Sequence, residues 1–244
     1  MAQLVARLVR NEKVRGSNPL SSTSTDTIRP IATASLSEQF RSGSAAEHRS
    51  AEASAFMSAL VEGRVNAAGY AAYLGQLLPV YQRLESVGAE LGTHEHVRAL
   101  FDPALFRAEA IAVDLHHWGG DVIDSPATRA YQARIEQTLA DPVRYLGHHY
   151  TRYLGELSGG QVIGRVLERV FQLSDGLGTA FYRFERIEKV KPYKDGYRAR
   201  LDALSLTPDE QARVVEEVRI AFTLNQQLFD ELTDELPQYL THTA

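Results

Sequence analysis

Apolar residues recur at intervals of three and four along most of the chain, which is the spacing of one face of an α-helix. Alternation with period two, the pattern of a half-buried strand, is not sustained over a useful length. The pattern therefore predicts an all-α fold of roughly seven helices. The expected helical segments are residues 37–63, 67–91, 97–118, 126–140, a glycine-bearing stretch that follows Asp141-Pro142, 177–204 and 207–235.

Residue types at the ends of these segments indicate where several helices begin, bend or stop. Ser37 is a suitable N-cap for the first segment, and Gly63 is a suitable stop. Pro79 lies inside the second segment and should bend or split it, because proline lacks the amide proton that a helix interior uses. Thr207, followed by Pro-Asp-Glu, is the expected cap of the last helix.

The two ends of the chain lack this periodicity. Residues 1–35 mix Ser, Thr, Asn, Pro and Arg, which predicts a disordered leader. The leader lacks the apolar core of a secretory signal. Its arginine-rich composition suits an organellar transit peptide. It also resembles translated noncoding sequence upstream of a misassigned start, and we favour this last interpretation. We expect one domain over residues 36–237 and a disordered tail at 238–244.

Composition narrows the class of protein. A chain of 244 residues with 44% hydrophobic content can bury one good core. The absence of cysteine excludes disulfides, thiolate metal ligands and a cysteine nucleophile, and it is compatible with the cytoplasmic location that we expect. No apolar run reaches about 18 residues, so no membrane span is expected.

Charge is distributed unevenly. The net charge is -5, yet the first 30 residues carry five basic and two acidic side chains, which leaves -8 for the rest. Such an acidic body argues against a general nucleic-acid binder. Within it, the only lysines are Lys189, Lys191 and Lys194, flanked by arginines at 186, 198 and 200. This cluster is either a solvated basic face or a site for an anionic ligand or an acidic partner.

Four glycines interrupt the helical stretch YTRYLGELSGGQVIGR at residues 150–165, and each costs about 1 kcal/mol relative to alanine inside a helix. Gly155 and Gly159 share a helix face, and Arg152 and Glu156 lie on nearly the same stripe. One interpretation is close packing against another helix. The other is a bare face for a flat, wide ligand, with a cation and a carboxylate at its edge.

His48 is the candidate metal ligand on the first helix. Glu52, four residues later, can accept the proton on Nδ1 and leave Nε2 free for a metal. Arg41 lies seven residues earlier, roughly 10 Å along the same face. A lone histidine on a helix is usually structural, but this spacing suits a large ligand with a metal at one point and anionic groups at its edge.

Longer strings connect these features to one family. HHYTRYLGELSGGQVIGR resembles the distal-helix signature of the heme oxygenases, and LSEQFRSGSAAEHRSAEASAFM resembles their proximal-helix segment. VYQRLES, KDGYRARL and AFTLNQQLFDEL are similar to three further segments, in the family's order from Leu36 to Leu232. The resemblance implies a single-domain, multi-helix fold of the bacterial, biliverdin-producing type, with heme held between a proximal and a distal helix.

The resemblance also implies roles for individual residues. His48 would be the axial ligand of the heme iron, with Glu52 as its hydrogen-bond partner. The implied heme contacts are Arg41, Tyr150, Lys194 and Arg198 at the propionates, Gly155, Ser158 and Gly159 on the distal face, and Phe222 and Phe229 in the pocket. The implied catalytic network comprises Glu156, Arg152, Tyr81 and Asn225.

One position departs from the family pattern, because Glu156 stands where the family typically has aspartate. In the family that carboxylate holds a water beside the bound oxygen, so the extra methylene puts the efficiency and regiochemistry of the reaction in doubt.

The implied activity is cleavage of heme with O2 to biliverdin, ferrous iron and carbon monoxide. Electrons would come from an external ferredoxin or flavin reductase, since the chain has no dinucleotide-binding glycine motif and no cysteine for an iron-sulfur cluster. A heme carrier or sensor without turnover, and a helical scaffold without heme, are the alternatives.

Overall fold

The computed structural model describes residues 34–241, and these residues are helical apart from their connecting segments and one isolated bridge between Val65 and Leu240. The all-α prediction is therefore confirmed, while most of the expected leader, residues 1–33, lies outside the described residues. The α-helices are α2 (Leu36–Gly43), α3 (Ala45–Glu52), α4 (Ala55–Glu62), α5 (Ala67–Leu91), α6 (Glu95–Arg98), α7 (Ala108–His117), α8 (Pro126–Gln137), α9 (Pro142–His149), α10 (Gln161–Val170), α11 (Val190–Asp202), α12 (Pro208–Asp234) and α13 (Leu236–Tyr239). Two short 3-10 helices, η1 (Pro103–Leu105) and η4 (Ala180–Tyr182), and two π-helices, η2 (Tyr150–Leu154) and η3 (Glu156–Gly160), complete the set.

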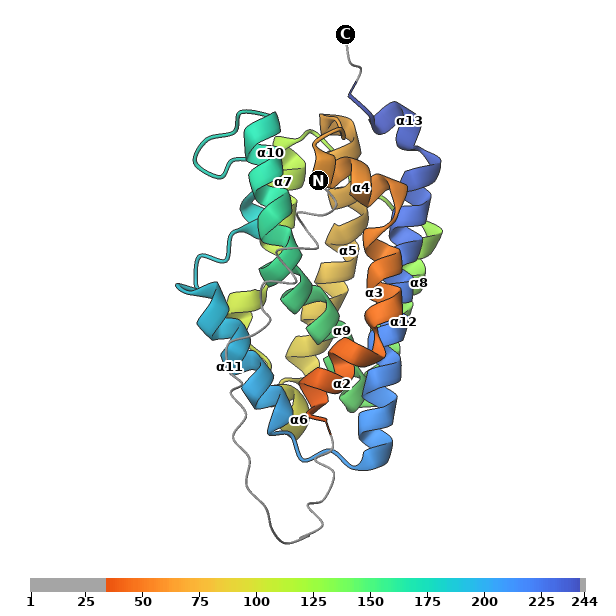
Figure 1. Ribbon diagram of the computed structural model, residues 1–244, viewed down its shortest axis with the longest axis vertical. Helices are drawn as coiled ribbons and strands as arrows, with labels where there is room; N and C mark the ends of the chain where they lie inside the picture. Colours follow the sequence, from red (N-terminus) through yellow and green to blue (C-terminus); the bar gives the residue numbers. More distant parts are fainter. Residues whose placement is uncertain (1–33, 242–244) are drawn as a thin grey trace, which may run out of the picture.

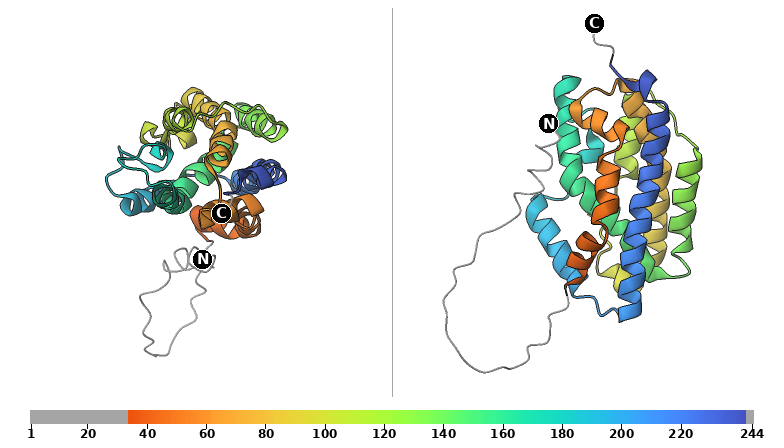
Figure 2. Two further views of the ribbon diagram at one scale, coloured as in Figure 1. Left: turned by 90° about the horizontal axis from the view of Figure 1, so that it is seen from above. Right: turned by 45° about the vertical axis from the view of Figure 1, so that its right-hand side comes forward.

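Two long helices, α5 and α12, run through most of the length of the molecule (Figure 1). Helix α12 packs against α2, α3, α4, α8, α9 and η2, and α5 packs against α7 and α8. Figure 2 shows α3 lying alongside α12 at one side of the bundle. The N-terminal helices and the segment after α9 are therefore positioned on the same long helix.

The first predicted helix is wrong as a single element, because residues 36–62 form three short helices. The N-cap of α2 is Ser35, which forms a capping box, and Ser37 instead donates to Asp202 on α11 through its backbone N–H at 2.7 Å and its hydroxyl at 2.9 Å. Ser44 and Ser54 mark the two breaks, consistent with the tendency of serine hydroxyls to bond to nearby backbone. Apolar periodicity continues across such breaks and cannot reveal them.

Pro79 does not split α5, which continues from Ala67 to Leu91. A proline leaves the carbonyl four residues earlier without its helical donor. Here that carbonyl, on Gly75, accepts the backbone N–H of Ile123 at 3.0 Å. A Cβ on Gly75 would lie 2.4 Å from the carbonyl oxygen of Asp121, so the glycine allows the loop to approach closely enough to make this bond.

The segments expected at 97–118 and 177–204 are helical only in part. The first divides into α6, η1 and α7, and most of residues 177–189 form a loop before α11 begins at Val190. Gly176 and Gly178 adopt left-handed φ angles of 76° and 73° in this loop. Asp114 of α7 then accepts the backbone N–H groups of Ala180 and Phe181 at 2.9 and 2.8 Å, which fixes η4. The helix expected at 126–140 ends at Gln137.

The C-terminal boundary extends beyond the predicted one. Helix α12 begins with the predicted Thr207 capping box and ends at Asp234. Residues 238–241, expected to be disordered, include the end of α13 and make backbone hydrogen bonds: Asn66 donates to Tyr239 at 2.7 Å, and Thr241 donates to Arg64 at 2.8 Å. This return of the chain ties its C-terminal end to the start of α5.

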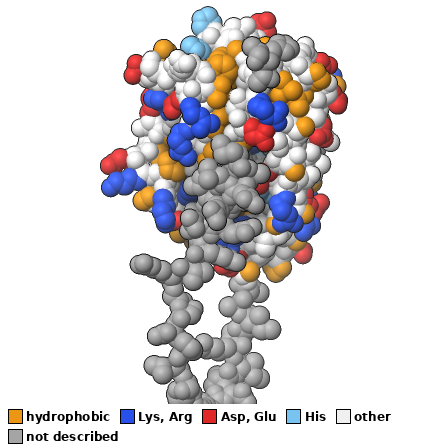
Figure 3. Space-filling view, turned by 45° about the horizontal axis from the view of Figure 1, so that its top comes forward, with side chains coloured by type: hydrophobic (Ala, Val, Ile, Leu, Met, Phe, Trp, Pro, Cys, Tyr) orange, Lys and Arg blue, Asp and Glu red, His pale blue; other side chains and the backbone are white. Residues whose placement is uncertain are grey.

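The surface is mixed in charge. On the face shown in Figure 3, lysine and arginine side chains lie in several small groups among acidic and apolar ones. Within residues 34–241, none of the helices combines the length and apolar character that crossing a membrane requires.

Candidate active site

The glycine-bearing stretch leaves α-helical geometry between Tyr150 and Gly160, where η2 and η3 are π-helices. Short π-helices are rare and frequently occur at functional sites. Their turn is wider than that of an α-helix, so residues three apart separate further around the axis. The expectation that Arg152 and Glu156 share a stripe with Gly155 is therefore wrong: Gly155 and Gly159 are exposed, whereas Arg152 and Glu156 are buried.

The four glycines serve two purposes. A Cβ at Gly155 or Gly159 would meet no heavy atom within 4 Å, and the neighbouring Ser158 is also exposed. A Cβ at Gly160 would instead lie 2.7 Å from Glu156 Oε2, and one at Gly164 would lie 3.2 Å from Tyr182 Cβ. The first pair thus leaves a bare helix face, while the second pair permits close packing.

Beneath this bare face, the four predicted network residues lie in direct contact. Glu156 Oε1 accepts hydrogen bonds from the Tyr81 hydroxyl at 3.2 Å and from Arg152 Nη2 at 3.0 Å. Arg152 also donates to the Tyr81 hydroxyl at 3.3 Å and to Asn225 Oδ1 on α12. The guanidinium carbon lies 5.0 Å from the centroid of the Tyr81 ring. The network therefore joins α5, η2, η3 and α12.

Burial controls the electrostatics of this network. It raises the pKa of Glu156 above its ordinary value, although the Arg152 guanidinium and the Tyr81 hydroxyl act in the opposite direction. Burial also raises the pKa of Tyr81, again opposed by Arg152. A carboxyl group with a raised pKa is closer to protonation at neutral pH, which suits it to hold or transfer a proton.

His48 lies on α3 beside α12. Its Nδ1 is 3.4 Å from Glu52 Oε2, as the spacing predicts, and the two side chains are 45% and 52% exposed. The His48 ring makes an edge contact with Phe222 of α12 at a centroid distance of 5.3 Å. Phe229 lies two turns further along α12, where it is buried against Tyr73 at 6.1 Å.

Basic side chains converge near the start of η2. Burial raises the pKa of Tyr150, while the positive charges of Arg198 on α11 and Arg41 on α2 lower it. Lys194 of α11 donates to Ser158 Oγ of η3 at 3.1 Å. The predicted propionate-binding residues therefore lie along the glycine-bearing segment, from Tyr150 at its start to Ser158.

The arrangement fits an anionic iron porphyrin: a histidine with an oriented ring, a side-chain-free face and a group of cations. Comparison with known proteins tests that interpretation. The family model described as heme oxygenase matches residues 34–231. The chain belongs to the heme oxygenase family.

The similarity to individual heme oxygenases is extensive. The enzyme is 34% identical over 213 residues to heme oxygenase from Porphyra purpurea, covering 85% of this chain and 90% of the relative. It is 34% identical over 207 residues to heme oxygenase 1 from Synechocystis sp., with 82% and 86% covered. The crystal structure of Synechocystis heme oxygenase-1 in complex with heme aligns with a TM-score of 0.80 at 33% identity, covering 84% of this chain and 95% of that one.

Family membership settles the class of activity that the sequence left open. This heme oxygenase is a heme-degrading enzyme, for which heme is both substrate and prosthetic group. The alternative of a heme carrier or sensor without turnover is not supported by these relatives. A more distant structure, heme oxygenase from Neisseria meningitidis, has a TM-score of 0.62 at 16% identity and shares the fold.

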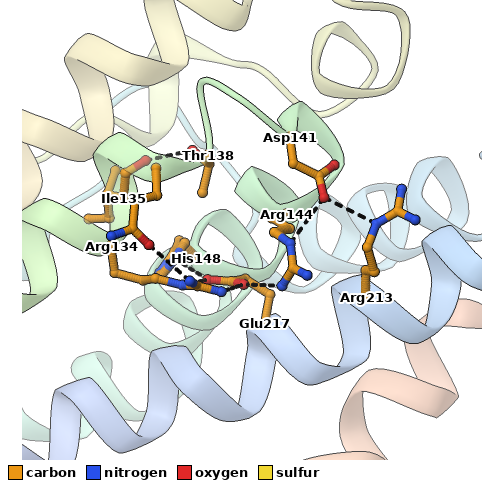
Figure 4. A network of polar contacts seen from close by, with 9 residues as sticks. Arg134, Ile135, Thr138, Asp141, Arg144, His148, Arg213 and Glu217 are labelled. Atoms are coloured by element: carbon orange, nitrogen blue, oxygen red, sulfur yellow. Dashed lines mark hydrogen bonds and ion pairs between the residues drawn. The ribbon is translucent and has the colours of Figure 1, made fainter.

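The helix that leads into the distal segment of this heme oxygenase is anchored by a residue that sequence patterns did not reveal. Glu217 of α12 is fully buried and accepts hydrogen bonds from Arg134 Nε at 2.7 Å, Arg144 Nη1 at 2.9 Å and His148 Nε2 at 2.9 Å (Figure 4). Burial alone would raise the pKa of Glu217, but these partners outweigh it and lower the pKa to about 2. At Gly147 the backbones of α9 and α12 meet, because a Cβ there would lie 3.0 Å from backbone atoms of α12.

A second buried histidine, His149, connects the distal segment to α11. Its Nδ1 shares a hydrogen bond of 2.8 Å with the Tyr197 hydroxyl, and the two rings are stacked with an interplanar angle of 9°. Burial lowers the pKa of His149 to about 3, so the ring is neutral over the physiological range. Sequence alone gives no signal for this pairing, because the two residues are 48 positions apart.

Proposed function

We propose that this heme oxygenase holds heme between α3 and the bare face of Gly155 and Gly159, with His48 Nε2 as the axial ligand of the iron. Support comes from the Nδ1 contact with Glu52, which favours the tautomer with an unprotonated Nε2. When bound, heme supplies the iron at which O2 is activated and the porphyrin ring that is cleaved to biliverdin, ferrous iron and carbon monoxide. The observation that carries the proposal is a side-chain-free surface directly above a buried charged network.

The basic group orients the substrate in its plane. Arg41, Lys194 and Arg198 form charge-assisted hydrogen bonds to the propionates, and the Tyr150 hydroxyl adds a neutral donor. In this proposal Lys194 exchanges its bond with Ser158 for one with a propionate. Reversing the charge at Arg41 and Lys194 together should weaken heme affinity or change which biliverdin isomer forms.

The distal residues exclude large groups and manage protons. Gly155, Ser158 and Gly159 bring the helix backbone against one side of the ring, so that only a small ligand can enter. Glu156 Oε1 is held by Tyr81 and Arg152, which leaves Oε2 to bind a water and pass a proton to it. Asn225 fixes the Arg152 guanidinium from the opposite side.

Reducing equivalents come from outside the chain in this proposal. An external donor such as a ferredoxin or a flavin reductase supplies electrons, and O2 is the co-substrate. We also propose that the enzyme works in the cytoplasm. Cell fractionation and reconstitution with purified ferredoxin and its reductase would test these two points separately.

A single titration and turnover series tests the heme site. Hemin is added to the purified protein, the Soret band is recorded, and reductant and catalase are then supplied under air while carbon monoxide is trapped. We expect loss of the Soret band, rising bilin absorption and released carbon monoxide. A His48→Ala variant should lose the histidine-ligated spectrum and recover it when imidazole is added, whereas His116→Ala, an exposed position at the end of α7, should behave as wild type. A stable Soret band under reduction, or an unaltered His48→Ala spectrum, would contradict the proposal.

A further inference from the structure

Two buried tyrosine hydroxyls near the distal network form no hydrogen bond of normal geometry among the described residues, although each acts on the pKa of the other as a neighbouring hydrogen-bonding group. They belong to Tyr70 of α5, which is 0% exposed, and to Tyr182 of η4, which is 3% exposed. Buried hydroxyl groups in folded proteins are almost always paired with protein atoms or with ordered water. The two neighbouring hydroxyls therefore mark a place that suits a shared polar partner.

Tyr182 lies directly beside the carboxylate of Glu156. A Cβ built on Gly160 would be 2.7 Å from Glu156 Oε2 and 2.9 Å from Tyr182 Cδ1, so the oxygen and the ring edge border the same point. The ring also packs over Gly164, where a Cβ would lie 3.3 Å from Tyr182 Cδ2. The absence of side chains at these two glycines allows the Tyr182 ring to pack against the segment next to Glu156 Oε2.

The position of Tyr182 is fixed by its neighbours. Gln161 Nε2 donates to the Tyr182 carbonyl at 2.6 Å, and the Asp114 carboxylate binds the two backbone N–H groups that precede Tyr182. These bonds fix the backbone of η4 at Tyr182, and the side chain that it carries is buried.

The two tyrosines and Glu156 also act on one another electrostatically. Burial raises the pKa of Tyr182, and Tyr70, Tyr73 and Glu156 raise it further. Burial likewise raises the pKa of Tyr70, and Asp114 raises it further, while the interaction with the Tyr182 hydroxyl lowers it and Glu156 makes the smallest contribution. Glu156 Oε1 already accepts two hydrogen bonds from Tyr81 and Arg152, whereas Oε2 is the oxygen on the side of Tyr182.

We propose that Tyr70 and Tyr182 form a second branch of the Glu156 network, in which bound water links the two hydroxyls to Glu156 Oε2. The branch makes Tyr70 and Tyr182 positioning residues for the distal carboxylate. A glutamate has one more rotatable bond than an aspartate, so hydrogen bonds to Oε1 alone leave Oε2 incompletely fixed. Contact with the second branch restrains that oxygen. This inference rests on the proposed role of Glu156 at the heme.

The first test measures the acid–alkaline transition of the ferric heme spectrum. Tyr182→Phe and Tyr70→Phe are compared with wild type and with Tyr145→Phe, whose hydroxyl donates to the Leu84 carbonyl and whose pKa responds to burial and Glu85. We expect either branch variant to change the proton affinity at this transition at least twofold, which moves its midpoint by about 0.3 pH units. The control should not shift it, and Tyr182→Phe should produce no further shift in a Glu156→Gln background.

The second test uses the protein without heme. If water links the hydroxyls to Oε2, replacing tyrosine by phenylalanine leaves that water and the carboxylate short of a partner and lowers the urea midpoint of unfolding. Hydroxyls without any partner would give the opposite result, because their removal relieves a desolvation cost.

The proposal is overturned if neither branch variant shifts the heme transition, or if both variants raise the urea midpoint. Failure of the wild type and of the Tyr145→Phe control to give a histidine-ligated heme spectrum would instead refute the proposed function. The two failures are therefore distinguishable.

Discussion

Substitution of Glu217 should be one of the most destabilising single changes in the protein. Replacing it with glutamine keeps the shape of the side chain but removes the negative charge shared by Arg134, Arg144 and His148. Its pKa falls from the ordinary 4.5 to about 2. Since one pKa unit corresponds to about 1.4 kcal/mol, the charge contributes about 3 kcal/mol to folding. Breaking a buried ion pair by removing one partner typically costs about 3–5 kcal/mol, in agreement.

The pH dependence follows from the direction of the shift. A carboxyl group whose pKa is lowered on folding contributes fully above its unfolded pKa of 4.5 and loses that contribution as the pH falls toward its folded pKa of about 2. Urea unfolding of Glu217→Gln followed by circular dichroism should therefore show a loss of about 3 kcal/mol at pH 7. The difference from wild type should shrink below pH 4.5.

The neighbouring Glu216 provides a matched control, because it is exposed and pairs only with Arg219 at 3.3 Å. Glu216→Gln should change the unfolding free energy by less than about 0.5 kcal/mol. A loss below about 1 kcal/mol in Glu217→Gln at pH 7, or a difference that stays constant down to pH 3, would refute the assignment of Glu217 as the anchor of α9.

Three further predictions concern the distal segment. The double variant Gly155→Ala, Gly159→Ala should stabilise the heme-free protein by up to about 1 kcal/mol per site. It should also weaken heme binding in a Soret titration. Tight binding by this variant would argue against the bare face as the heme contact. Gly160→Ala should lose about 1–3 kcal/mol in urea unfolding, because its Cβ would meet Glu156 Oε2 and the Tyr182 ring; an unchanged midpoint would contradict that packing. His149, with its pKa lowered from 6.5 to about 3, contributes fully above pH 6.5 and loses its contribution as the pH falls toward 3, about 2 kcal/mol by pH 5. His149→Gln should remove this part of the slope, and an identical slope in both proteins would show that the ring is not held neutral.

The fold class and the members of the predicted network could be assigned from the sequence, because helical periodicity and short motifs are recorded within single segments. Helical periodicity records which face is buried, and α5 and α12 have the expected positions with ends within a few residues. Tyr81, Arg152, Glu156 and Asn225 were assigned through a resemblance to known segments, and the structure brings their side chains within hydrogen-bonding distance.

Other features depend on contacts between distant segments, which periodicity does not record. Pro79 remains inside a continuous helix because Ile123, 44 positions later, supplies the missing donor to Gly75. The π-helical winding at Tyr150–Gly160 rotates Arg152 and Glu156 away from the bare glycines, an outcome that α-helical geometry applied to the same letters could not reproduce. In the sequence Glu217 is one more charged residue on an amphipathic helix, so its role as an anchor of α9 has no sequence signal.

Helix α12 fixes the relative positions of three contacts in the enzyme. Along one uninterrupted helix it places Glu217 against α9, Phe222 against His48, and Asn225 against Arg152. A single residue inserted between Glu217 and Phe222 would rotate everything beyond it by about 100°. Helix α9 would keep its anchor at Glu217, while His48 and Arg152 would lose their partners on α12. Length changes are therefore not expected to be tolerated within these nine positions, because helical phase sets where Glu217, Phe222 and Asn225 point.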